Sequence, residues 1–154
     1  MSLKDKLKQE IRSQEKSQID WTKRKYDWIA SVDELYGLVT NWFNDYKTEG
    51  LLEFKWTEKQ NSEEYIGSYS VKILHLFFAN GREIIVEPMG TLIIGAWGRF
   101  DFYARGYNSG KYYILCYKSD QGKFSWEVVN AQTKSDIGPL TKESLEQIIE
   151  KWLI

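Results

Sequence analysis

The feature of this sequence that most constrains its fold is a succession of short strand-like segments between residues 51 and 130. In the first of them, Leu52, Phe54 and Trp56 alternate with charged residues, which is the pattern of a strand that buries one face. Turn residues separate the segments closely, and parallel neighbours would need crossover helices for which there is no room. The pattern therefore predicts a mainly antiparallel, curved meander sheet. Seven strands are expected, at residues 52–56, 71–78, 82–87, 91–97, 99–105, 111–118 and 124–128.

A helix is predicted before the sheet, over residues 31–49. Ser31 and Glu34 have the spacing of a capping box, in which each side chain bonds a free amide at the start of a helix. Behind them, apolar residues recur at intervals of three and four, and Gly50 stands where a C-terminal cap belongs. The broad apolar face of this helix should pack on the sheet.

Residues 1–25 differ in charge from the rest of the chain. They hold eight basic and four acidic residues, a balance of +4, whereas the remainder carries −5. Ser2 can cap a helix here, and the only apolar stripe of that helix consists of Leu3, Leu7 and Ile11. So narrow a stripe buries little surface, and an isolated helix of this length is marginally stable. We expect a basic helical arm that docks on the body, docks on a partner, or frays.

A further helix is predicted at the C-terminus, over residues 141–153. Gly138-Pro139 interrupts the chain before it, and Thr141 is a good N-cap residue. The elements together predict a single α+β domain over residues 1–154, with the sheet at residues 51–130 and with N-terminal helices and the C-terminal helix packed on it.

Composition and charge narrow the class of protein. Hydrophobic residues make up 42% of the 154 residues, which is too much apolar material for a disordered chain. The net charge of −1 offers no global field for nucleic acid or anionic membranes, and the apolar runs fall far short of the ~20 residues that span a bilayer. The single cysteine, Cys116, rules out an internal disulfide and fits a reducing compartment. We therefore expect a cytoplasmic protein with no membrane partner.

Motifs for catalysis, metals and cofactors are weak. The lone histidine, His75, lies in a predicted central strand and is better explained as a buried, hydrogen-bonded residue than as a catalytic base. Cys116 lies in mid-strand and is expected to be an inert buried thiol. Zinc requires clusters of these two residue types, so we predict no metal and no cofactor. Gly106-x-x-x-Gly110-Lys111 departs from the phosphate-binding loop in its spacing and in the residue after the lysine, which favours a hairpin loop.

Glu53 and Lys55 share one face of the first strand, as a carboxylate and a lysine do in many metal-dependent nucleases. That chemistry would need a second acidic ligand on a neighbouring strand, and Asp101 is the best candidate. Alternating charges on the solvated face of an edge strand explain the pair without chemistry. We favour this second interpretation.

The segment from Gly95 to Arg105 holds the strongest candidate site. Alternation sends its phenylalanines to the core and its polar residues to the opposite face. Guanidinium groups are rigid bidentate donors, so arginine paired with aspartate beside an aromatic ring can hold an anionic or planar ligand. The other interpretation, which we favour, is a solvated face whose Arg–Asp ion pairs are weak. Gly95 and Gly98 indicate a bulge, a kink, or close approach by another backbone. The candidate binding residues are Trp97, Arg99, Asp101, Tyr103 and Arg105.

The motifs of the second half of the chain resemble those of small uncharacterised bacterial proteins. The resemblance covers about residues 70–154 and rests on Pro88-x-Gly90, Gly95-x-x-Gly98-Arg99-x-Asp101-x-Tyr103, a strand with Trp126, and a Leu-rich terminal helix. It implies a bacterial origin and no particular activity.

Three classes of function remain open. The first is a non-catalytic module that binds a protein partner or a small ligand and could form a homo-oligomer, which the surplus of aromatic residues favours. The second is a small hydrolase or nuclease-like enzyme that uses His75, Glu53 or Asp101. The third is a nucleic-acid accessory protein that uses the basic arm, although the interspersed acidic residues make nucleic acid a less favoured partner.

Overall fold

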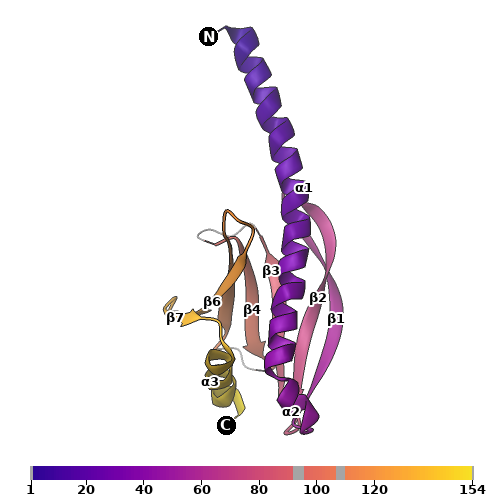
Figure 1. Ribbon diagram of the computed structural model, residues 1–154, viewed down its shortest axis with the longest axis vertical. Coiled ribbons are helices and arrows are strands. Elements are labelled where there is room, and N and C mark those ends of the chain that lie inside the picture. Colours follow the sequence, from indigo (N-terminus) through magenta and orange to yellow (C-terminus); the bar gives the residue numbers. More distant parts are fainter. Residues whose placement is uncertain (1, 92–95, 107–109, 154) are drawn as a thin grey trace.

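The chain begins with one continuous helix, α1 (Leu3–Trp42), which is 40 residues long and therefore roughly 60 Å in length. It starts at the predicted cap, because the Ser2 hydroxyl accepts a hydrogen bond from the Asp5 amide at 3.2 Å. Its N-terminal part projects beyond the sheet (Figure 1). This computed structural model describes residues 2–91, 96–106 and 110–153, with the side chains of residues 13–20 excepted.

The predicted start of a helix at Ser31 is wrong, because α1 runs through this position without a break. Ser31 is fully buried, and its hydroxyl donates to the Trp28 carbonyl at 2.7 Å. A serine inside a helix can bond back to the preceding turn in this way instead of capping a new helix. Glu34 is exposed on the outer face. The predicted arm and the predicted second helix are therefore parts of one element.

A short helix, α2 (Asn44–Thr48), leads from α1 into the sheet. Gly50 follows it with a positive φ of 75°, and the Leu51 amide donates to the Tyr46 carbonyl at 2.9 Å. Glycine adopts this backbone conformation without steric cost. Gly50 thus ends the helical region at the predicted position.

A seven-stranded antiparallel sheet follows, in which each strand pairs with the next one in the sequence (Figure 1). This order confirms the predicted meander. The sheet is open, so its first and last strands lie at its two edges. The strands are β1 (Leu52–Glu63), β2 (Gly67–Phe78), β3 (Glu83–Gly90), β4 (Gly98–Ala104), β5 (Tyr112–Lys118), β6 (Phe124–Asn130) and β7 (Asp136–Pro139).

The strands differ from the prediction in two places. The predicted strand at residues 91–97 is absent from the described part of that segment, and residues 92–95 lie outside the described chain. The seventh strand is β7, in which Pro139 lies opposite Glu127 and Gly138 opposite Val128. The sequence predicts a break at Gly138-Pro139, but proline is compatible with an edge strand, where its missing N–H costs no ladder bond.

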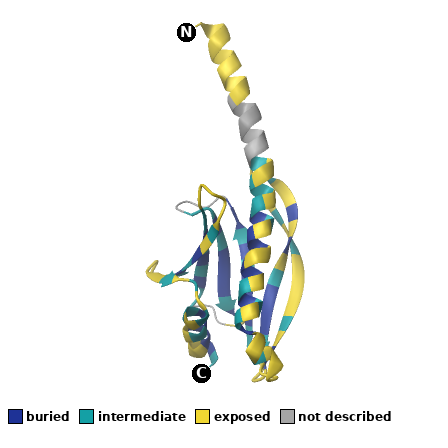
Figure 2. Ribbon diagram, viewed as in Figure 1, coloured by how far each residue is buried: buried dark blue, intermediate teal, exposed yellow. Residues whose placement is uncertain are grey.

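The two long helices cover the same face of the sheet. From α1, Trp28 and Tyr36 pack against Phe100 with ring centroids 5.0 and 6.3 Å away. From α3 (Lys142–Leu153), Trp152 packs against Phe102 at 5.0 Å. The even-numbered side chains of β4 therefore face the core, as the alternation predicts. Buried residues line this part of the sheet and the C-terminal half of α1, whereas the projecting end of α1 is exposed (Figure 2).

The start of α3 is also as predicted. The Thr141 hydroxyl accepts a hydrogen bond from the Ser144 amide at 3.0 Å, and the Thr141 amide donates to the Ser144 hydroxyl at 2.9 Å. This reciprocal pair satisfies free backbone amides at the helix start. Within the described residues, neither α3 nor any other helix has both the length and the apolar character required to cross a membrane.

Gly98, at the start of β4, lies directly against Trp28. A Cβ atom at this position would be 2.3 Å from Cζ3 and 2.8 Å from Cε3 of the indole, which is fully buried. The predicted close approach therefore occurs at Gly98, with a side chain in place of another backbone. Gly95 lies outside the described residues.

Candidate functional site

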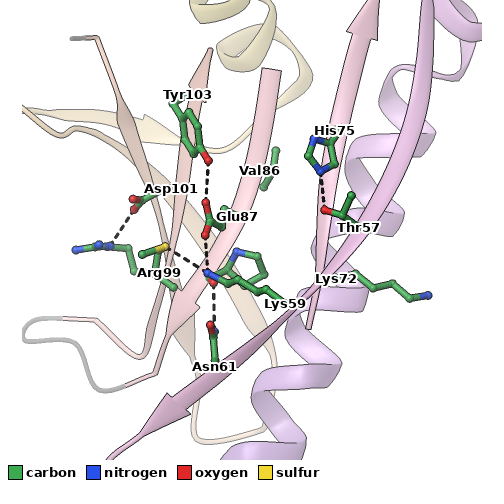
Figure 3. A network of polar contacts seen from close by, with 12 residues as sticks. Thr57, Lys59, Asn61, Lys72, His75, Val86, Glu87, Arg99, Asp101 and Tyr103 are labelled. Atoms are coloured by element: carbon green, nitrogen blue, oxygen red, sulfur yellow. Dashed lines mark hydrogen bonds and ion pairs between the residues drawn. The ribbon is translucent and has the colours of Figure 1, made fainter. Parts of the chain in front are cut away.

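Most of the polar candidates on β4 belong to a network on the sheet face opposite α1 and α3 (Figure 3). Antiparallel pairing places Glu87 opposite Asp101 and Ile85 opposite Tyr103, so polar side chains of several strands meet there. We call this group the polar network. Its members are Lys59 of β1, Glu83 and Glu87 of β3, Arg99, Asp101 and Tyr103 of β4, and Arg105 and Lys111, which flank β4 and β5.

Asp101 is the most enclosed residue of the polar network, with only 3% of its surface exposed. Its Oδ1 lies 3.1 Å from Arg99 Nε, and its Oδ2 accepts a hydrogen bond from Lys111 Nζ at 3.0 Å. The Arg99 guanidinium also lies 4.4 Å from the Tyr113 ring centroid. A buried carboxylate is costly unless it is paired, so these cations stabilise it. The alternation predicts a solvent-exposed position for Asp101. Its burial is explained by the ion pairs with Arg99 and Lys111.

Glu87 joins the two sides of the polar network. Its Oε1 accepts from the Tyr103 hydroxyl at 2.8 Å, and its Oε2 accepts from Lys59 Nζ at 2.7 Å. Burial alone would raise the pKa of the Glu87 carboxyl, but the bonds from Lys59 and Tyr103 outweigh burial and hold this pKa below its ordinary value of 4.5. Burial and the same Glu87 carboxylate raise the pKa of Tyr103, which therefore stays protonated as a donor.

The lowered pKa of Glu87 predicts how stability depends on pH. Ionised Glu87 stabilises the folded state above pH 4.5, and this contribution is lost as the pH falls through the lower folded-state pKa. Glu87→Gln should therefore lower the free energy of unfolding at pH 7, and the difference from the wild type should shrink by about pH 3. Urea unfolding across this range measures both effects. The matched control is Glu150→Gln on the exposed face of α3, and an equally pH-dependent loss in that variant would contradict the prediction.

His75 is buried and hydrogen-bonded through both ring nitrogens, as predicted. Its Nε2 lies 2.7 Å from Thr57 Oγ1, and its Nδ1 lies 2.8 Å from Glu83 Oε1. Arg105 binds the same carboxylate with two guanidinium nitrogens. These bonds from Arg105, reinforced by His75 and opposed by burial, hold the pKa of the Glu83 carboxyl below 4.5.

Thr57, His75 and Glu83 place a hydroxyl, an imidazole and a carboxylate in line, the order of groups found in hydrolase triads. A hydrolase also aims donors at the oxyanion that forms on the substrate. Thr57 lies in the regular strand β1, where successive amides point to opposite edges and do not converge on one point. The line is therefore better explained as a cross-strand polar contact that satisfies a buried histidine.

Trp97 lies apart from the other candidate binding residues. Its ring packs 5.9 Å from Trp28 and 5.5 Å from Phe124, on the helix side of the sheet. The Arg24 guanidinium lies 5.3 Å from the same ring and donates to the Trp97 carbonyl at 2.9 Å. Trp97 thus holds α1 to the sheet and shares no surface with the polar network.

Glu53 and Asp101 do not converge. They lie on β1 and β4, three strand spacings apart, or about 14 Å. In the part of the chain that the structure describes, no three histidine, cysteine or acidic side chains gather as metal ligands would. Cys116 is buried, and burial raises the pKa of its thiol to about 12, so little of it ionises near neutral pH.

A second candidate surface is the projecting end of α1. All of the residues from 2 to 12 are exposed, including Leu3 at 74%, Leu7 at 50% and Ile11 at 54%. Their spacing of four places them on one face of the helix. We call residues 3–12 the arm and these three side chains its apolar stripe.

Contacts further along α1 anchor the arm to the body. Trp21 stacks on Tyr65 at the tip of the β1–β2 hairpin, with ring centroids 5.4 Å apart and planes 13° apart. Arg24 donates to the carbonyls of Thr91 and Trp97. Burial lowers the pKa of the Arg24 guanidinium, and the nearby Glu63 carboxylate partly offsets this. These contacts hold α1 where it leaves the sheet.

Sequence reasoning missed Lys59, Glu83, Glu87 and Thr57 as partners of the candidate residues. The available signal is parity: Thr57 and Lys59 lie at odd-numbered positions of β1 with Glu53 and Lys55, and Glu83 and Glu87 lie four residues apart in β3. That signal places them on one face, but strand register decides which of them meet.

Comparison of the chain with protein-family models, with curated proteins and with solved structures finds no match. The resemblance to small bacterial proteins therefore stays a prediction.

Proposed function

We propose that this chain is a non-catalytic protein-interaction module that contacts its partner through the arm. The observation that carries the proposal is the exposure of the apolar stripe, since Leu3, Leu7 and Ile11 each leave half or more of their surface in solvent. Single exposed leucines are ordinary, whereas a contiguous apolar stripe on an otherwise polar surface is typical of an interaction site. A cytoplasmic location, which the single buried cysteine favours, belongs to the same proposal.

The arm is presented as a preformed helix. An isolated helix of about ten residues would be marginal in water, but the arm continues a helix whose other end is packed on the sheet. Continuity with that docked segment avoids a new nucleation step. A preformed helix loses less conformational entropy on binding than a disordered segment does.

The charges beside the apolar stripe indicate the partner. Lys4, Lys8 and Arg12 each follow a stripe residue by one position, so they form a parallel basic row about 100° around the helix. Residues 2–12 carry four basic and two acidic side chains, a net charge of +2. Two arms would repel each other, so we infer that the partner is an amphipathic helix of another protein whose apolar face is flanked by acidic residues.

The polar network offers less support for a small-ligand site. Glu83, Glu87 and Asp101 each already pair with a cation of the same chain. A ligand that used Arg99, Arg105 or Lys111 would have to displace a carboxylate that these cations already bind. At Asp101, which is only 3% exposed, such a displacement would leave a buried carboxylate unpaired, which is strongly unfavourable.

A three-probe binding assay tests the proposal. The probes are a fluorescent helical peptide with leucines at intervals of four flanked by glutamates, vesicles containing phosphatidylserine, and a DNA duplex. The full chain should bind the peptide. Leu7→Glu should weaken this binding at least about tenfold, while Gln9→Glu should change it by less than about threefold. The two variants add the same charge to exposed sites on opposite faces of the arm.

The other outcomes contradict the proposal. Equal losses in the two variants would mean that charge alone, and not the apolar stripe, attracts the peptide. Binding to vesicles or to DNA in preference to the peptide would support a membrane or nucleic-acid partner. Binding to none of the three probes would also contradict the proposal. Thermal unfolding of both variants checks that the fold is intact.

A further inference from the structure

Strand β1 leaves one long edge of the sheet unpaired. It lies at the end of the strand order and pairs with β2 in unbroken register over 12 residues, and it contains neither proline nor glycine. The opposite edge, β7, has four residues and includes Pro139. A long, regular edge is a template for pairing with another strand, whereas a short edge with a proline is protected from pairing.

The backbone groups at this free edge can be assigned. The Ala79 amide donates to the Leu51 carbonyl at 2.8 Å, so this carbonyl and the backbone groups of the alternate residues after Leu51 point toward β2. The residues between them, among them Phe54 and Trp56, direct their N–H and C=O groups away from the sheet. Within the described residues, no group of the chain hydrogen-bonds to these outward amides and carbonyls of Phe54 and Trp56.

The side chains along β1 are complementary to those of β1 in a second, antiparallel copy of the chain. On the helix side, Leu52 and Phe54 lead to Trp56, which is 46% exposed beside Tyr36. On the opposite face, Glu53 and Lys55 are both exposed. Neither of these two forms an ion pair within the described part of the chain. Lys55 Nζ lies 4.5 Å from the ring centroid of Phe77, which is uncharged, so among the described residues the two opposite charges lack a charged partner and can form ion pairs with another molecule.

We propose that two copies of the chain pair through their β1 edges, antiparallel and around a twofold axis at Phe54. In this register Glu53 faces Lys55 of the partner subunit, Leu52 faces Trp56 of the partner subunit, and the two Phe54 residues face each other. Because of the twofold axis, each pair of two different residues occurs twice. Opposite charges and apolar side chains directly across a strand pair stabilise a sheet, so the register is favourable on both faces.

Other twofold registers are less favourable. The outward backbone groups of β1 belong to even-numbered residues. An even-numbered residue of one copy must therefore lie opposite an even-numbered residue of the other copy. A centre at Glu53 or at Lys55 would bring like charges face to face, and a centre at Thr57 would set Lys55 against Lys59. A centre at Trp56 would pair Glu53 with Lys59, but Lys59 already bonds Glu87 at 2.7 Å. Phe54 remains the best centre.

Charge exchange tests this register. Sedimentation equilibrium of the full chain at up to about 1 mM should show a monomer–dimer equilibrium. Lys55→Glu and Glu53→Lys should each weaken dimerisation about tenfold, because two attractive pairs become repulsive. The double variant Glu53→Lys/Lys55→Glu restores opposite charges across the axis and should regain wild-type affinity within about threefold. Thermal unfolding should be nearly unchanged in all three, since both positions are exposed.

Each remaining result would overturn the proposal. A wild-type chain that stays monomeric at about 1 mM would contradict it, and so would a Lys55→Glu chain that dimerises normally or a double variant that stays monomeric. The variant Leu7→Glu separates this interface from the arm. It should dimerise normally, and a loss of dimerisation there would mean that the copies associate through the arm.

Discussion

Replacing Phe102 with alanine should lower the free energy of unfolding by about 3–5 kcal/mol, enough to unfold a domain of ordinary stability. Phe102 is fully buried at the centre of the helix-covered sheet face, where its ring lies 5.0 Å from that of Trp152. The truncation removes apolar burial and leaves a cavity between β4 and α3. Chemical denaturation followed by tryptophan fluorescence measures the loss.

The control for this prediction is Arg105→Ala, close to Phe102 in sequence. Its guanidinium is 62% exposed and pairs with Glu83, so the expected loss is under about 1 kcal/mol. A stable Phe102→Ala protein beside an unfolded Arg105→Ala protein would contradict the assignment of the two sheet faces. Arg99 is a poorer control, because its guanidinium lies against the buried carboxylate of Asp101.

Substituting Gly98 by alanine should cost about 3 kcal/mol, the upper end for overpacking. The added methyl would lie 2.3 Å from Cζ3 of Trp28, and that indole is fully buried, so it has no space into which to move. The φ of Gly98 lies outside the left-handed region, so the cost comes from the collision alone. Thermal and urea unfolding measure it.

A second variant shows whether the collision is the cause. In a Trp28→Leu background the ring atoms that would collide are gone, so Gly98→Ala should cost at least about 1 kcal/mol less there than in the wild type. The matched glycine is Gly37, in mid-helix with no atom within 4 Å of its would-be Cβ. Gly37→Ala should stabilise the protein by about 0.5–1 kcal/mol. Equal effects at Gly98 and Gly37 would contradict this account.

Ser31 shows why local sequence mislocates the start of a helix. Ser31 and Glu34 have the residue types and the spacing of a capping box, and a cap would satisfy free amides at a chain break. In the structure no amides are free at this point, because the apolar face of α1 continues upstream through Trp28, which is fully buried against the sheet. The serine hydroxyl then bonds back to the helix. Tertiary burial upstream of the motif decides the outcome.

The polar network shows what alternation predicts and what it omits. Period-two patterning correctly separates Phe100 and Phe102 from the polar side chains of β4. It contains no information on which residue of β3 or β5 lies opposite each of them. The register brings Glu87 to Tyr103 and Lys111 to Asp101, and these contacts turn a predicted solvated face into a paired and partly buried one.

The sequence by itself determines the meander, the parity of its strands and the caps at Ser2, Gly50 and Thr141, because each depends on neighbours a few residues away. Only the tertiary structure decides that α1 is a single helix and that Gly138-Pro139 is part of an edge strand. It also decides that Trp97 packs against α1 and lies outside the polar network. These outcomes depend on packing between segments far apart in the sequence, such as Trp28 on Gly98 and Arg24 on Trp97. The free energy of such contacts exceeds local propensity, and local patterns do not encode it.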